Sequence, residues 1–123
     1  MKHFLIAALL AASLTTPVGA EPEIDARPPD SKAERQKNNA AKLAGLVGFV
    51  RSSCPEARAD DERLKAVVLR LGVDPADLEQ GDLALRAKAY AEIYAKDVPA
   101  NCARAIENFG ETGTTMRGLI GKN

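Results

Sequence analysis

Apolar residues recur at helical spacing from about residue 32 of this 123-residue chain onward. In the first segment they lie three and four positions apart, as on the buried face of a helix. These positions are Ala40, Leu43, Val47 and Val50, with Leu46 and Phe49 beside them. Ser31, followed three residues later by Glu34, fits a capping box at a helix start. The pattern therefore predicts a helix that ends just before Ser53.

Three more helical segments are expected in the rest of the chain. One starts at the acidic run that begins at Asp60, and Gly72 is placed to end it. The next starts at Asp74 and Pro75, and Asp82 is expected to cap its second part. The last segment begins at Pro99.

The predicted fold is an all-α bundle of about four helices with irregular termini. The helices are expected over residues 32–52, 60–71, 75–97 with a break near Gly81, and 99–109.

A strip of small residues runs beside the buried stripe of the first helix. Its members are Ala41, Gly45, Gly48 and Ser52. Glycine inside a helix costs up to about 1 kcal/mol relative to alanine, so a packing reason is expected. We expect another helix backbone or a tyrosine to approach this strip, and a bound ligand is the alternative.

The N-terminal residues have the three-part pattern of a secretory signal peptide. A cationic start at Lys2 precedes an apolar run, and small residues end at Ala20, where cleavage is expected. The apolar run is about half as long as a membrane span. The predicted organisation is a signal peptide at 1–20, a disordered, proline-rich acidic leader at 21–31, a helical domain at 32–110 and a Gly/Thr-rich tail at 111–123. We expect a periplasmic or secreted protein without stable membrane insertion.

Charge and histidine content narrow the functional classes. The chain has 17 Lys and Arg against 17 Asp and Glu, and removal of Lys2 with the signal leaves a net charge of −1. This balance lacks the basic footprint of a nucleic-acid binder. The only histidine, His3, leaves with the signal, which excludes His-based catalytic arrangements and His-ligated metal or haem sites. We expect no enzyme, catalytic residue, cofactor or metal site.

The two cysteines, Cys54 and Cys102, are expected to form one structural disulfide, because we expect the chain to be exported and each cysteine lies near a helix boundary. Closing this loop of 49 residues stabilises a fold by about 4 kcal/mol in the chain-entropy treatment. A redox site normally has Cys-x-x-Cys spacing, and two thiols without histidine make a poor zinc site. The link would tie the end of the first helix to the last.

Arg86, Tyr90 and Tyr94 share one side of the third segment and are the candidate interaction surface. Tyrosines four residues apart on a helix also commonly border a core with their hydroxyls in water. Both interpretations stay open at this point.

Three functions are compatible with these features. The first is an exported non-enzymatic protein that acts by binding another protein, as inhibitors and immunity proteins do. The second is an acid-stress chaperone. The general layout of the chain, with Cys54 and Cys102 far apart in sequence, is similar to that of HdeA-type acid-stress chaperones, although no residue motif matches. Protonating all 17 carboxylates would leave about +16, and self-repulsion would open such a bundle. The third is a small-ligand carrier that holds an apolar ligand between the glycine strip and the tyrosines.

Overall fold

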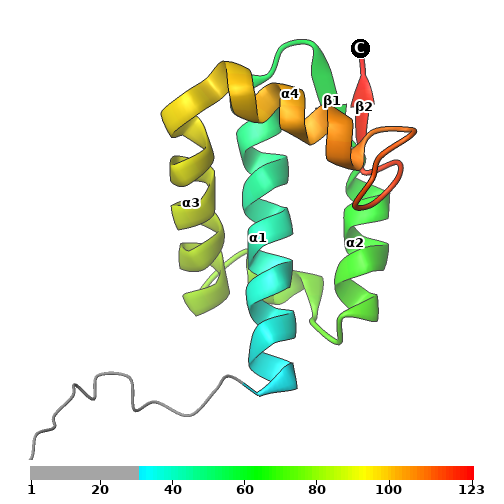
Figure 1. Ribbon diagram of the computed structural model, residues 1–123. Helices are drawn as coiled ribbons and strands as arrows, with labels where there is room; N and C mark the ends of the chain where they lie inside the picture. The colour runs from blue at the N-terminus through cyan, green and yellow to red at the C-terminus, as the bar shows by residue number, and fades with distance from the viewer. Residues whose placement is uncertain (1–30) are drawn as a thin grey trace, which may run out of the picture.

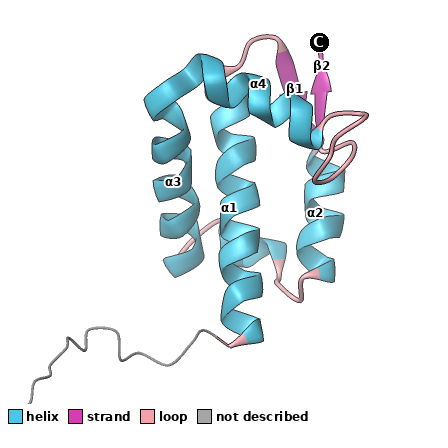
Figure 2. Ribbon diagram, in the orientation of Figure 1, coloured by secondary structure: helices cyan, strands magenta, loops and turns pink. Residues whose placement is uncertain are grey.

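The computed structural model describes residues 31–123, so the predicted signal peptide and leader residues 21–30 lie outside the described residues. This part of the chain is mainly helical, and the predicted all-α class with one disulfide is confirmed (Figures 1 and 2). The elements are α1 (Lys32–Ser53), β1 (Ala57–Ala59), α2 (Asp61–Arg70), η2 (Pro75–Leu78), α3 (Asp82–Tyr94), η3 (Ala95–Asp97), α4 (Val98–Phe109) and β2 (Ile120–Lys122), where η denotes a short 3-10 helix.

Helix α1 is the central element of the fold. Figure 1 shows it standing between α3 and α2, while α4 crosses its C-terminal end. Its most extensive contact is with α3, and Gly45 explains the close approach. A Cβ atom added at Gly45 would lie 2.5 Å from the Ala87 carbonyl oxygen and 2.7 Å from the Tyr90 Cβ. The predicted packing role is confirmed for Gly45, whereas a Cβ at Gly48 would meet no atom within 4 Å.

The prediction of about four helices is corrected to three helical runs among the described residues, namely α1, α2 and the continuous α3–η3–α4, beside the short 3-10 helix η2. Segments α3, η3 and α4 follow one another without an intervening loop residue. Pro99 lies in the first turn of α4, where the missing amide N–H has no helical partner to lose. The Asp97 side chain accepts a hydrogen bond from the Ala100 amide at 3.2 Å and caps the new helix direction. A bend, rather than a break, therefore separates α3 from α4.

The predicted helix boundaries are accurate to about one residue where a cap is present. Ser31 accepts from the Glu34 amide at 3.1 Å, and Asp74 accepts from the Ala76 amide at 2.9 Å. Gly72 adopts a φ of 81°, and the following Val73 amide donates to the Val68 carbonyl, which completes a Schellman motif. The expected cap at Asp82 is wrong: Gly81, with a φ of 79°, occupies the cap position and Asp82 is the first helical residue.

The C-terminal residues are ordered as a strand, which corrects the expectation of an irregular C-terminus. Strand β2 pairs antiparallel with β1, and Ala59 lies opposite Ile120 in the register. The Leu119 and Ile120 side chains are fully buried in the core. The connection turns tightly at Gly118, whose φ of 82° suits glycine. The chain therefore gains a small two-stranded sheet that holds its end against the helices.

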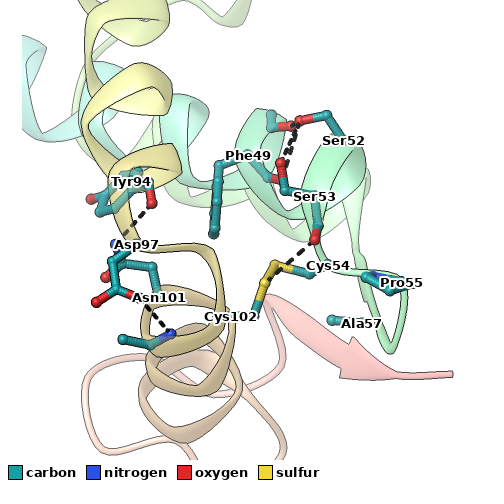
Figure 3. The surroundings of a disulfide bond; sticks show 12 residues. Phe49, Ser52, Ser53, Cys54, Pro55, Ala57, Tyr94, Asp97, Asn101 and Cys102 are labelled. Carbon is teal, nitrogen blue, oxygen red and sulfur yellow. Dashed lines mark hydrogen bonds between the residues drawn. A yellow bond between two sulfur atoms is a disulfide. The ribbon is translucent and has the colours of Figure 1, made fainter.

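The disulfide lies inside the larger of two hydrophobic clusters. Cys54 follows α1 and Cys102 lies in α4, with their Cα atoms 5.6 Å apart and both side chains 3% exposed. Figure 3 shows Phe49 next to the two sulfur atoms. Val50 and Ile120 belong to the same buried cluster. The covalent link thus fixes the crossing of α4 over α1, as the sequence predicts.

Candidate functional site

The three residues of the predicted interaction surface lie along the side of α3 that meets α1. The Arg86 guanidinium pairs with Glu34 of α1 at 3.6 Å and with Asp82 at 2.8 Å. The Tyr90 hydroxyl accepts a hydrogen bond from the Asn38 side-chain amide at 2.8 Å. These contacts connect α3 to α1.

Tyr94 has a different environment from the other two residues. Its ring is half-buried and packs against Phe49, with ring centroids 5.8 Å apart and an interplanar angle of 41°. Burial raises the pKa of the Tyr94 hydroxyl above the ordinary value of 10.0, and the neighbouring Tyr90 raises it further. The hydroxyl therefore stays protonated at neutral pH.

The structure does not gather Arg86, Tyr90 and Tyr94 around one cavity. Arg86 lines a cavity of about 260 Å³ together with carboxylates of both α1 and α3, whereas Tyr94 lines cavities nearer to α4. The space between Gly45 and Tyr90, which is the position predicted for a carrier's apolar ligand, is occupied by the α3 backbone and the Tyr90 side chain. A ligand at that position would have to displace a helix.

A groove on another face of α1 is the best-formed candidate site. Two cavities of about 350 Å³ each share five lining residues and so adjoin one another. We call this the α1 groove. Its lining residues are Asn39, Lys42, Leu43, Leu46, Leu71, Tyr94, Asn101, Arg104, Ala105, Asn108, Phe109, Thr115 and Met116.

The groove exists because α4 covers only part of one α1 face. On this face Val50 is buried under the region where α4 crosses, and Leu46 is only 4% exposed at the edge of the crossing. One and two turns earlier, Leu43 is half-buried and Asn39 is exposed. Figure 1 shows α3 and α2 on the two sides of this uncovered part of α1. The buried stripe of α1 thus continues into a surface groove.

The loop after α4 forms the end of the groove. The Asn108 carbonyl accepts from the amides of Thr115 and Met116, both at 3.0 Å, which brings these two residues back beside α4. The Asn108 side-chain oxygen accepts from the Thr114 hydroxyl at 3.0 Å. A Cβ at Gly113 would lie 2.4 Å from the Asn108 carbonyl oxygen, so this loop path requires glycine. Met116 is thereby held over the apolar part of the groove.

The charge of the α1 groove distinguishes it from the other cavities. Among the described residues, its lining contains two cations, Lys42 and Arg104, and no carboxylate. Three other cavities each carry side chains of both signs. On α4 itself, Arg104 faces the groove while Glu107 lines a separate cavity. The groove is therefore a locally basic site in a nearly neutral chain.

Within residues 31–123, no group of three or more His, Cys, Asp or Glu side chains is arranged to hold a metal ion. In the same part of the chain, no helix combines the length and hydrophobicity that crossing a bilayer demands.

Sequence reasoning identified Tyr94 but missed the other groove residues as a site. Leu43, Leu46 and Phe109 have the helical spacing of core positions, and that spacing does not tell how far a neighbouring helix will cover them. Thr115 and Met116 lie in a tail whose path the sequence left open. The separation of Arg104 from Glu107 is seen only in the structure, where the two residues line different cavities.

No protein-family model matches the chain, and no curated protein or solved structure is significantly similar to it. The groove's own geometry and charge are therefore the basis for assigning a function.

Proposed function

We propose that this chain is an exported, non-enzymatic binding protein whose α1 groove holds a segment of another protein. One observation carries the proposal: partly exposed apolar side chains from α1, α3, α4 and the segments after α2 and α4 gather in this groove. They are Leu43, Leu71, Tyr94, Phe109 and Met116. Apolar surface in a rimmed depression is typical of binding sites.

Covering these apolar side chains with a partner would lower the free energy. Removing apolar surface from water contributes about 25 cal/mol per Å². Leu46 and Ala105 are buried at the base of the groove. A partner side chain would therefore pack against a surface that is already formed. A preformed and rigid site loses little conformational entropy on binding.

Two features support a binding role over catalysis. The region 31–123 contains no histidine, which removes the commonest general acid–base group. Tyr94 has a pKa moved away from neutrality by burial, whereas a catalytic acid or base works best with a pKa near the operating pH. Tyr94 in the groove therefore acts as an apolar wall with a hydrogen-bonding tip.

Site-specific photo-crosslinking tests the proposal in the producing cell. A photoreactive amino acid is placed at Leu43 in the groove, and the matched control carries it at Leu85, which is 68% exposed on α3 outside the groove. We expect one defined protein adduct from position 43 and not from position 85. Identical adducts from both positions, or none from position 43, would contradict the proposal.

The same preparation tests the remaining predictions about localisation and ligand class. N-terminal sequencing should show a mature chain that starts at Glu21 in the periplasmic or secreted fraction. Native mass spectrometry of the purified protein should show the mass of the chain alone, because a co-purified small molecule would support the carrier instead. The acid-stress chaperone stays a prediction, which suppression of client aggregation near pH 2–3 would test.

A further inference from the structure

We infer that the segment held by the α1 groove is an acidic, amphipathic peptide, with apolar side chains on the α2 side of the groove and carboxylates on the α4 side. This inference rests on the function proposed above and specifies the partner chemistry. It follows from how the groove lining is divided between its two halves.

The half near α2 is mainly apolar. Leu43, Leu71 and Met116 line this cavity and are absent from the lining of the other one. They come from α1, from the residue that ends α2 and from the loop after α4. Three partly exposed apolar side chains from separate segments form a depression that suits one or two large apolar side chains.

The half near α4 has more polar side chains in its lining and contains both cations. Asn101, Arg104 and Asn108 lie on one side of α4, at spacings of three and four residues. The Arg104 guanidinium donates to the Asn101 side-chain oxygen at 3.3 Å, which orients it along α4. Lys42 of α1 lines both halves. The two cations thus lie on two different helices that border the same cavity.

The side chains of Lys42 and Arg104 are both exposed. Within residues 31–123, the ion pairs involve neither Lys42 nor Arg104. An arginine presents several N–H donors to a carboxylate in a planar fork, and a lysine adds a mobile positive charge. Complementary charge at an interface sets partner choice and accelerates association. Carboxylates next to an apolar cluster are therefore the matching chemistry.

Hydrogen-bonding side chains around the groove favour a peptide over a fatty acid. Asn39, Asn108 and Thr115 line it, and amide and hydroxyl groups can both donate to and accept from a peptide backbone. An alkyl chain offers no such partner and would leave these polar groups against hydrocarbon, which is unfavourable. We therefore assign the groove to a protein segment.

Isothermal titration calorimetry with two designed peptides tests the inference on the oxidised protein. Both peptides carry a leucine-rich half; the other half contains glutamates in one peptide and lysines in the second. The protein variants are K42Q/R104Q, and K88Q as a control on an exposed part of α3 outside the groove. Sodium decanoate, below its micelle concentration, serves as the lipid probe.

We expect the glutamate peptide to bind at least tenfold more tightly than the lysine peptide at about 50 mM salt, and less selectively at 500 mM. K42Q/R104Q should weaken glutamate-peptide binding about five- to tenfold, since each partly exposed ion pair contributes a factor of about two to five. K88Q should stay within twofold of the wild type.

Several results would overturn the inference. Equal binding of both peptides, or an unchanged affinity in K42Q/R104Q, removes the acidic specificity while leaving groove binding in place. Decanoate binding without peptide binding assigns the groove to a lipid. If crosslinking at position 43 captures a protein and neither peptide binds, the acidic-peptide inference alone is wrong. If position 43 also captures no protein, the proposed function is wrong.

Discussion

Replacing both Cys54 and Cys102 with alanine removes the covalent link between the end of α1 and α4. The two residues are 48 positions apart, so the link closes a loop of 49 residues. In the chain-entropy treatment, such a loop lowers the entropy of the unfolded chain by about 14 cal/mol/K, which corresponds to about 4 kcal/mol at 25 °C. Small domains have total unfolding free energies of about 5–15 kcal/mol. The double variant should therefore be strongly destabilised.

The expected change in melting temperature follows from the size of the domain. For a domain of 60–100 residues, each kcal/mol shifts the melting temperature by about 4–8 °C. A loss of about 4 kcal/mol thus lowers it by about 20 °C. The denaturant dependence, or m-value, should rise in the variant, because an uncrosslinked unfolded chain exposes more surface.

Urea unfolding followed by far-UV circular dichroism measures the free energy of unfolding and the m-value, and thermal unfolding measures the melting temperature. Wild-type protein reduced with dithiothreitol is the matched control, because it lacks the link but keeps both sulfur atoms in the core. We expect the reduced protein and the alanine variant to unfold at similar urea concentrations, both well below the oxidised protein. A difference under about 1 kcal/mol between oxidised and reduced protein would refute the stabilising role of the link.

Three further predictions concern packing and pH. Gly45→Ala should destabilise the protein by about 1–3 kcal/mol, because the new Cβ meets α3, while Gly48→Ala, where space is open, should stabilise it by up to about 1 kcal/mol in the same urea assay. Ile120→Ala should cost about 2–5 kcal/mol, because this strand side chain is fully buried, and an unchanged melting curve would show that the C-terminus does not pack on the core. The raised pKa of Tyr94 means that the folded state holds its proton longer than the unfolded chain, so this contribution to stability is complete below pH 10 and is lost as pH rises through the folded-state pKa. Absorbance titration at 295 nm should show one late-titrating tyrosine that is missing in Tyr94→Phe.

Local signals in the sequence were sufficient to predict where the helices lie. Ser31, Gly72 and Asp74 each specify a helix end through a hydrogen bond or a backbone conformation that few other residues provide. The pairing of Cys54 with Cys102 follows from a chain that has two cysteines and is expected to be exported. These features depend on residues close in sequence or on covalent chemistry, and both are visible without a structure.

The sheet was not predictable by the same means. Strand β1 consists of Ala57, Arg58 and Ala59, and β2 has glycine at its centre. Neither segment alternates apolar and polar residues over a useful length or has high strand propensity. Strand β2 follows β1 by about 60 residues, so the two strands pair only because the loop after α4 brings the chain back to the segment that follows α1. Tertiary contacts, rather than local preference, determine it.

The α1 groove was hidden for a related reason. Leu43 and Val50 share one helical stripe in the sequence, yet only Val50 is fully buried. The difference comes from the position of α4, which the disulfide fixes over the C-terminal part of α1. Hydrophobic periodicity gives the face of a helix that packs, but not the length over which a crossing helix covers it. The site is therefore a product of helix geometry.

The most direct test of the central claim is the pattern of amide chemical-shift changes when ¹⁵N-labelled protein is titrated with the glutamate peptide. If the α1 groove binds acidic protein segments, the shifts should saturate and be concentrated in residues 39–46 of α1 and 101–116 of α4 and its following loop. Shifts concentrated around the exposed Leu85 and Ile93 of α3, or no shifts at millimolar peptide, would contradict the account.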